Sequence, residues 1–168
     1  IDDLVERLAF VKAWIDEGKP ATYWISGFFF PQAFLTGTLQ NFARKYTVPI
    51  DNVAFDFEMM AKDWYRNKPQ DGAYIKGLYL EGAGWDAEKM CLKRQEPKVL
   101  VVPLPILEMI PSGGAVKLHG VFVTPVYVTQ DRRNAMGVGL VFEANLATDE
   151  HTSLWVLQGV ALSLNTDA

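Results

Sequence analysis

The chain has 168 residues, with 16 basic and 20 acidic side chains and a formal net charge of −4. This length predicts one domain over residues 1–168. The composition, with 49% hydrophobic and 21% charged residues, is typical of a globular protein and excludes a disordered one. The mild acidity argues against a nucleic-acid partner, one cysteine excludes an internal disulfide, and no apolar run reaches the roughly 18–20 residues that span a membrane.

The first 48 residues carry the periodicity of helices. Gly18 and Pro20 end a first helix whose apolar residues recur at helical spacing, namely Leu4, Leu8, Val11 and Ile15. Asp2 and Asp3 are its expected caps. A second helix is expected to begin at Pro31, because the fixed φ of proline suits a first helical turn. We expect the two helices to pack on the rest of the chain through Leu4, Leu8, Phe34, Leu39 and Phe42.

Residues 49–168 show a period of two, which indicates strands. Apolar and polar residues alternate over 53–59, and the further expected strands are Tyr74–Leu80, Met90–Gln95, Val99–Leu107, Gly120–Thr129, Gly137–Leu146 and Val160–Leu164. A helical turn is expected over Thr152–Gln158. Pro103, Pro105 and Pro125 predict edges, bulges or strand ends. The expected fold is α+β: N-terminal helices followed by an antiparallel β-barrel or sandwich.

Two motifs invite a catalytic interpretation. Gly82-Ala83-Gly84 fits a relaxed dinucleotide-binding pattern after a strand, but no crossover helix follows, so a tight turn between strands is favoured. Asp56 and Glu58 lie two apart, as paired catalytic carboxylates would, but they are also the polar half of an alternating strand, which is the favoured interpretation. The sequence contains no phosphate-binding P-loop. We therefore expect no catalytic residue, metal or cofactor, and no ATP binding by this domain.

The remaining candidates have equally plain structural explanations. His119 and His151 are expected to be surface or interface histidines, and Cys91 a buried small hydrophobe. Arg132 and Arg133 follow an apolar run, and they are expected either to grip carboxylates of a partner or to form a solvated hairpin tip. The aromatic residues between Trp24 and Phe34 would form a ligand platform or, as favoured, pack between helix and sheet.

Several stretches resemble the C-terminal domain of dynein heavy chains, and they follow one another in the family's order. They are Trp24–Gly37 (WISGFFFPQAFLTG), Gln40–Lys45, Ile50-Asp51, Phe55–Glu58, Gly77–Asp86 (GLYLEGAGWD), Pro103-Leu104-Pro105, Thr124–Tyr127, Arg132-Arg133 and Trp155–Leu162 (WVLQGVAL). The sequence of residues 30–37 (FPQAFLTG) is more similar to axonemal than to cytoplasmic heavy chains. The absence of an initiator methionine also predicts a piece of a longer protein.

The resemblance implies a non-catalytic domain that docks on the AAA+ motor ring of the same heavy chain and modulates microtubule-based motility. Nucleotide sites and the microtubule-binding tip of such motors lie upstream, so the partners are ring modules, with other dynein subunits and microtubules reached through the parent motor. The implied location is the cytoskeleton of a ciliary or flagellar axoneme in the cytoplasm. Arg132 and Arg133 are the docking residues expected here. The alternative hypothesis is a stand-alone β-barrel module that binds a small ligand or peptide on the 23–34 aromatics or an exposed edge strand.

Overall fold

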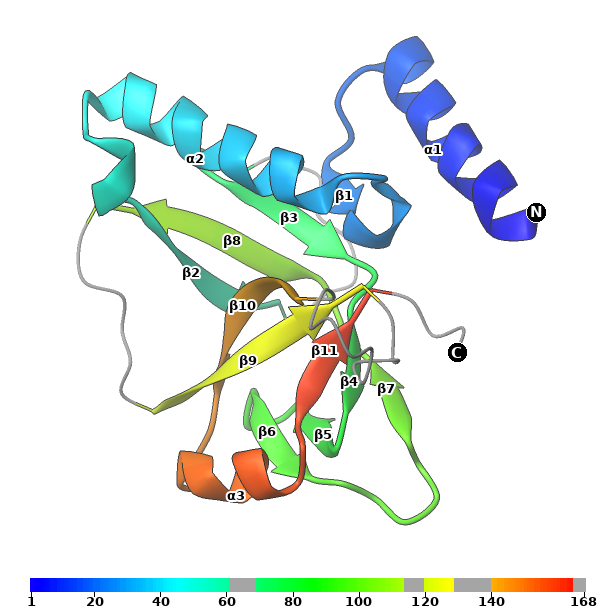
Figure 1. Ribbon diagram of the computed structural model, residues 1–168, viewed down its shortest axis with the longest axis vertical. Coiled ribbons are helices and arrows are strands. Elements are labelled where there is room, and N and C mark those ends of the chain that lie inside the picture. Colours follow the sequence, from blue (N-terminus) through cyan, green and yellow to red (C-terminus); the bar gives the residue numbers. More distant parts are fainter. Residues whose placement is uncertain (61–68, 114–119, 129–139, 165–168) are drawn as a thin grey trace.

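A computed structural model describes residues 1–60, 69–113, 120–128 and 140–164 (Figure 1). Helices come first and strands follow, so the predicted α+β class is confirmed. Helix α1 (Asp2–Glu17) and helix α2 (Pro31–Tyr46) are separated by strand β1 (Thr22–Trp24) and the 3₁₀ turn η1 (Ile25–Gly27), and a second turn η2 (Ile50–Asn52) follows α2. The sequence did not predict β1, because three residues are too few to show a period.

The helix ends follow from local chemistry. Pro31 occupies the first turn of α2 as predicted, and Thr47 ends this helix in the left-handed conformation, with a φ of 54°. At α1 the cap position is taken by Ile1, so Asp2 and Asp3 are not caps. They lie in the first turn instead, where carboxylates favour the positive end of the helix dipole.

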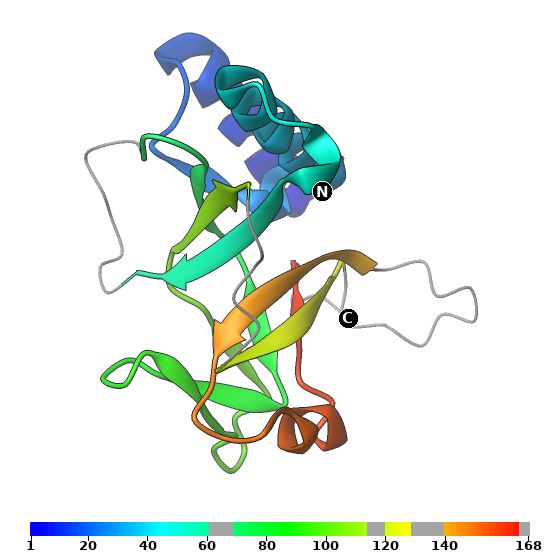
Figure 2. The same ribbon diagram turned by 90° about the vertical axis from the view of Figure 1, so that its left-hand side faces the viewer.

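The strands form two sheets and a separate hairpin. The first sheet has the order β1-β3-β8-β2, the second has the order β10-β9-β11-β4-β7, and β5 pairs with β6. Pairing is antiparallel except between β1 and β3 and between β9 and β11. Within the described residues the sheets form no closed barrel, and a sandwich fits them (Figure 2). The bounds are β2 (Ala54–Met59), β3 (Ala73–Lys76), β4 (Tyr79–Glu81), β5 (Ala83–Asp86), β6 (Cys91–Arg94), β7 (Val101–Pro103), β8 (Leu107–Ser112), β9 (Val121–Tyr127), β10 (Leu140–Ala147) and β11 (Ala161–Ser163).

Two expected strands are each divided into two. The run Tyr74–Leu80 is β3 and β4 with a break at Gly77, and the run Val99–Leu107 contains β7 and the start of β8 with Pro105 between them. Both breaks are corners at which the backbone passes from one sheet to the other, since β3 pairs with β8 and β4 pairs with β7. The Leu104 amide donates to the Leu78 carbonyl at 2.9 Å, which holds the two segments together through the bend.

The prolines of the strands follow the prediction at one edge and depart from it in the interior. Pro103 lies in β7, the edge of the second sheet, as predicted. Pro125 lies in β9, which has β10 on one side and β11 on the other, so of the predicted alternatives the edge is wrong, whereas the β9–β10 register shifts between Leu140 and Phe142, next to this proline, as expected of a bulge. The departure is tolerated because β11 pairs with β9 only at Val126 and Tyr127, beyond the proline.

The core lies between the sheets and below α2. Its fully buried side chains come from both sheets and from helix α3 (Thr152–Leu157), and include Ile75, Leu80, Leu107, Met109, Val126, Leu162 and Trp155. The rings of Phe57 in β2 and Phe142 in β10 stack at 6.0 Å and join the sheets where these strands meet. The buried indole of Trp155 donates to the Thr148 hydroxyl at 2.7 Å, which satisfies the nitrogen inside an apolar core.

The packing expected of the two helices is correct for α2 and wrong for α1. In α2, Phe34, Leu39 and Phe42 are half-buried, and Leu35 is buried beside them. In α1, Leu4 and Leu8 are exposed. The reason is that α1 has a second apolar face, formed by Phe10 and Trp14, and this face contacts the rest of the domain.

Candidate functional site

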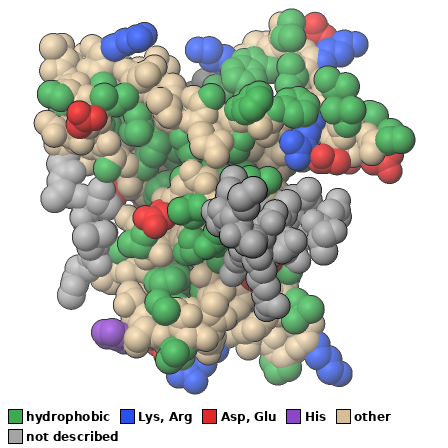
Figure 3. Space-filling model, viewed as in Figure 1, with side chains coloured by type: hydrophobic (Ala, Val, Ile, Leu, Met, Phe, Trp, Pro, Cys, Tyr) green, Lys and Arg blue, Asp and Glu red, His purple; other side chains and the backbone are tan. Residues whose placement is uncertain are grey.

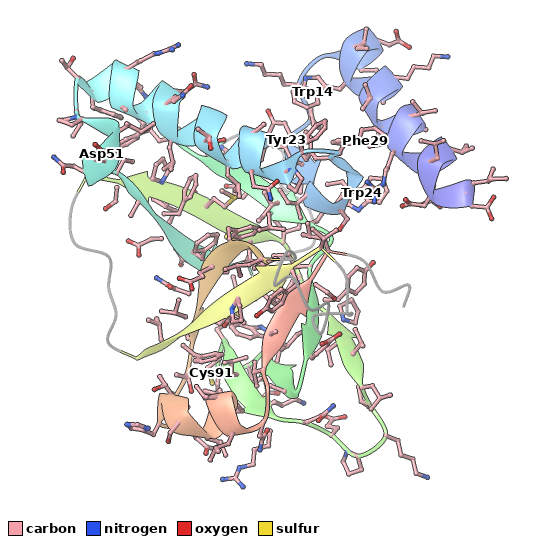
Figure 4. All side chains as sticks on the ribbon, in the orientation of Figure 1. Trp14, Tyr23, Trp24, Phe29, Asp51 and Cys91 are labelled. Atoms are coloured by element: carbon pink, nitrogen blue, oxygen red, sulfur yellow. The ribbon has the colours of Figure 1, made fainter. Side chains whose placement is uncertain are left out.

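Helix α1 lies at the periphery and contacts the domain through an aromatic cluster. Phe10 meets Phe28 edge to face at 5.7 Å between ring centroids. Trp14 meets Tyr23 in the same way at 5.3 Å, and Figure 4 labels both of these residues. Edge-to-face pairs are favourable beyond the area that they bury. The cluster therefore fixes one side of the helix and determines which side faces outward.

The opposite side of α1 is an apolar surface without a partner in the described structure. None of its sixteen residues is buried. The outer face of α1 consists of Leu4, Val5, Leu8 and Ile15, which are 49%, 58%, 54% and 77% exposed. At about 100° per residue, Leu4, Leu8 and Ile15 fall within one narrow stripe that lies roughly 100° around the helix from Trp14. Figure 3 shows hydrophobic side chains gathered at this end of the molecule, at the upper right. Such stripes normally mark contact surfaces.

Two exposed aromatic residues lie where the backbone enters α2. Phe29 is half-exposed and its ring lies 5.5 Å from the guanidinium of Arg7, whose Nε is 2.9 Å from an Asp3 carboxylate oxygen. Phe30 is more exposed than Phe29. The aromatic segment 23–34 is thus divided: Tyr23, Phe28 and Phe34 pack against the core, as favoured from the sequence, whereas Phe29 and Phe30 face outward.

The carboxylates singled out from the sequence show no catalytic arrangement. Asp56 and Glu58 both lie in β2, which confirms the predicted strand, and Asp56 is half-buried whereas Glu58 is exposed. Glu58 lies directly opposite Glu108 of β8. Burial, and secondly the charge of Glu58, raise the pKa of Glu108. Among the described residues no group of three metal-binding side chains comes together.

The glycine motif forms a turn, as predicted. Gly82 joins β4 to β5 with a φ of 79°, and Gly84 lies inside β5 opposite Lys93 of β6. A dinucleotide site needs a helix after this strand, so that the amides of its first turn face the phosphates. A hairpin stands there instead, and the dinucleotide arrangement is therefore not formed.

The remaining candidates are structural where they are described. The Nδ1 of His151 accepts a hydrogen bond from the Ser153 amide at 3.2 Å and caps α3. Cys91 is buried, and burial, followed by the carboxylate of Asp149 at 3.6 Å, raises the pKa of its thiol, which disfavours the reactive thiolate. Arg132, Arg133 and His119 lie outside the described residues.

The sequence contained a signal for the outer face of α1 that the prediction misinterpreted. Leu4, Leu8 and Ile15 form one helical stripe, and Phe10 with Trp14 forms a second. A helix with two apolar stripes has more apolar surface than one neighbour can cover.

Neither α1 nor any other helix in the described ranges is long and apolar enough to cross a membrane.

Comparison with known proteins gives one consistent family. Residues 1–164 match the family described as the C-terminal domain of the dynein heavy chain. The chain is 46% identical over 168 residues to Dynein axonemal heavy chain 3 of Homo sapiens, covering 96% of its own length and 4% of that relative. It is 47% identical to Dynein axonemal heavy chain 10 of Homo sapiens, with 97% and 4% covered. It is 48% identical over 161 residues to the Dynein-1-alpha heavy chain, flagellar inner arm I1 complex, of Chlamydomonas reinhardtii, with 93% and 4% covered.

Proposed function

The chain belongs to the family of C-terminal domains of dynein heavy chains, and we propose that it is the non-catalytic C-terminal domain of an axonemal heavy chain that docks on the AAA+ motor ring. It spans only 4% of the length of the curated relatives described above. Nucleotide hydrolysis and microtubule binding are assigned to the parts of the heavy chain beyond it. The proposed setting is the cytoskeleton of a ciliary or flagellar axoneme, where other dynein subunits join the parent motor.

The observation that carries ring docking is the outer face of α1. Its exposed leucine, valine and isoleucine side chains form one stripe on a helix whose other side is already packed. Full burial of an aliphatic side chain contributes about 1.5–3 kcal/mol, so several such residues suffice to hold a domain on a neighbouring surface. The occupant that we assign to this face is an apolar surface of the ring modules of the same heavy chain.

Docking gives the domain a means to modulate motility. A domain that contacts several ring modules shifts the equilibrium between the arrangements of these modules if its free energy of contact differs between nucleotide states. The shift cannot exceed that difference, and one exposed helix face is enough to supply a few kcal/mol. Arg132 and Arg133 remain a second proposed contact, which charge reversal of both arginines would test in the same assays.

Paired substitutions on α1 test the proposal. In the Leu4→Asp/Leu8→Asp variant, the free energy of unfolding of the isolated 168-residue domain should change by no more than about 1 kcal/mol, about 0.5 kcal/mol for each of the two exposed side chains. In the whole heavy chain the same variant should change the microtubule-stimulated ATPase rate or the gliding velocity. The matched control is Ala9→Asp/Ala13→Asp, which adds the same two charges to exposed positions that lie at least about 100° around the helix from the stripe of Leu4, Leu8 and Ile15. Equal motor effects from both pairs, or none from the leucine pair, would refute docking through this face.

A further inference from the structure

Strands β2 and β10 each lie at the edge of a sheet, and these two edges meet. Among the described strands, β2 has only β8 as a hydrogen-bonded neighbour and β10 has only β9. The two edge strands contact each other without pairing, and Figure 2 shows them side by side, β2 in teal and β10 in orange. A cavity of about 250 Å³ lies between them. We name it the β2–β10 crevice, and its lining consists of residues 57–59 of β2, residues 145–147 of β10, Trp85, Met90 and Leu107.

The backbone of β2 presents unpaired hydrogen-bonding groups to the crevice. Along an antiparallel strand, a residue whose N–H and C=O groups bond to the neighbouring strand alternates with one whose groups point away from it. The Met60 amide donates to the Ile106 carbonyl at 2.9 Å, in register with the pairs between β2 and β8. Glu58, two residues earlier, therefore also bonds to β8. The N–H and C=O groups of Phe57 and Met59 consequently point to the free edge.

Strand β10 presents its backbone in the same way. The Thr148 amide donates to the Gly120 carbonyl at 3.0 Å, in register with the pairs between β10 and β9. The alternation then directs the N–H and C=O groups of Asn145 and Ala147 away from β9. Donors and acceptors thus lie on both sides of the crevice. The ligand that matches them is an extended polypeptide backbone, because it carries N–H and C=O groups on both of its sides at the spacing of a strand.

The interior of the crevice suits one side chain of such a segment. Its volume is below the roughly 300–1,000 Å³ of sites that hold small molecules, and its inner walls include the buried side chains of Met59, Leu107 and Leu146. The indole nitrogen of Trp85 is buried without a hydrogen-bond partner in the described structure. A buried donor without an acceptor costs free energy, which a carbonyl oxygen of the bound segment would recover.

The outer side of the crevice is acidic. Side chains alternate between the two faces of a strand, so Asp56 and Glu58 lie on the opposite face of β2 from its apolar residues. Together β2 and β10 carry three carboxylates, the third being Glu143, and no basic residue. None of the three forms an ion pair within the described residues. Glu58 also lies directly opposite Glu108, so like charges already repel there, and a basic side chain beside them would offset this repulsion.

We propose that the β2–β10 crevice binds an extended segment of a partner protein in which basic and apolar residues alternate. The segment pairs with the free edge of β2, places an apolar side chain in the cavity beside Met59, and turns its basic side chains toward Asp56 and Glu58. In such strand addition the main-chain hydrogen bonds supply affinity and the side-chain contacts supply specificity. The proposal does not depend on ring docking, because the lining of the crevice contains no residue of α1.

Three peptides and the ¹⁵N-labelled 168-residue domain test the proposal. Ac-Lys-Leu-Lys-Leu-Lys-NH₂ should bind with a Kd of about 1 mM or tighter and shift the Trp85 indole N–H signal. At about ten times the Kd it should slow hydrogen exchange of the Phe57 and Met59 amides about tenfold. The charge-reversed Ac-Glu-Leu-Glu-Leu-Glu-NH₂, and Ac-Lys-Lys-Lys-Leu-Leu-NH₂, which has the same composition without alternation, should each bind at least about tenfold more weakly. Equal binding of the three peptides, or unchanged exchange of both amides, would overturn the proposal.

A charge reversal and a modified peptide locate the contact. Glu58→Lys should weaken binding of the alternating lysine peptide at least about tenfold, whereas Glu17→Lys, the same change at an exposed position of α1, should leave it unaltered. In the proposed pairing the leucine N–H groups of the peptide face β2, since directly opposite residues share a face. Methylation of both leucine nitrogens should therefore also weaken binding at least about tenfold, and this test needs no change in the protein. Unweakened binding of the methylated peptide would refute main-chain pairing.

The peptide-free domain distinguishes the other possible occupants. Slow exchange of the Phe57 and Met59 amides without peptide would mean that another segment of this chain fills the crevice. Slowing that increases with protein concentration would identify a second copy of the domain. Either result would overturn the proposal. Leu4→Asp/Leu8→Asp should not alter peptide binding, so failure of ring docking and failure of this proposal are distinguishable.

Discussion

Replacement of Gly77 by alanine should be among the most damaging single changes in this fold. Gly77 turns the backbone from β3 in the first sheet to β4 in the second, with a φ of 94° that residues with a Cβ rarely adopt. A Cβ at this position would lie 2.6 Å from the Ser26 hydroxyl oxygen and 2.7 Å from a ring carbon of Trp24. Ser26 also donates a hydrogen bond to the Gly77 carbonyl at 2.5 Å, so its hydroxyl cannot move away without losing this bond.

The magnitude follows from two separate effects. The unfavourable φ costs about 1–3 kcal/mol, and forcing a methyl group between two packed side chains costs about 1–3 kcal/mol more. Reduced freedom of the unfolded state returns about 0.4–1 kcal/mol. The expected loss in the free energy of unfolding is therefore about 1–5.5 kcal/mol, a large share of the roughly 5–15 kcal/mol typical of a domain.

Gly159→Ala is the matched control, because it isolates the backbone effect. Gly159 has a φ of 65°, and a Cβ there would meet nothing within 4 Å. Its substitution should cost only about 0–1.5 kcal/mol, which is the strain of a left-handed residue less the same reduction in the freedom of the unfolded state. Both variants are measured by urea unfolding, followed by tryptophan fluorescence and circular dichroism. If Gly77→Ala were no more destabilised than Gly159→Ala, the close packing of Trp24 and Ser26 around the corner would not be what requires glycine.

Two further predictions concern one buried and one half-buried polar side chain. Thr148→Val removes the acceptor of the buried Trp155 indole, so the free energy of unfolding should fall by about 1–3 kcal/mol. The same substitution at the exposed Thr36 is the control, and it should have little effect in urea unfolding. Glu108→Gln should abolish part of the pH dependence of stability. The pKa of Glu108 is raised above 4.5 in the native state. The contribution of Glu108 to the free energy of unfolding is therefore most favourable below pH 4.5 and is lost as the pH rises through the raised pKa. Urea unfolding from about pH 4 to about pH 7 should show the Gln variant gaining on the parent across this window, and a constant difference would contradict the assigned shift.

Most of the elements could be predicted from local sequence signals, whereas their connections could not. Helix α2 begins at Pro31 because its ring suits the first turn, and β9 and β10 show the alternation of half-buried strands. The corner at Gly77 has no local signature, since its φ is required by Trp24 and Ser26, which lie far earlier in the sequence. The parallel pairing of β1 with β3 also joins residues that are distant in sequence. Such features follow from tertiary packing, which periodicity does not encode.

The site shows the same limit in a sharper form. Leu4, Leu8 and Ile15 on one side of α1, and Phe10 and Trp14 on the other, are both apolar stripes at helical spacing. The aromatic residues make the contact with the domain because Tyr23 and Phe28 present complementary rings, and edge-to-face pairs add to the area that they bury.

The aliphatic stripe is consequently left largely in water, and its exposed area contributes nothing to the stability of the domain. Covering it would contribute free energy only in a larger assembly. The sequence of α1 therefore contains two apolar surfaces, one that packs in the fold and one that we propose to dock on the motor ring.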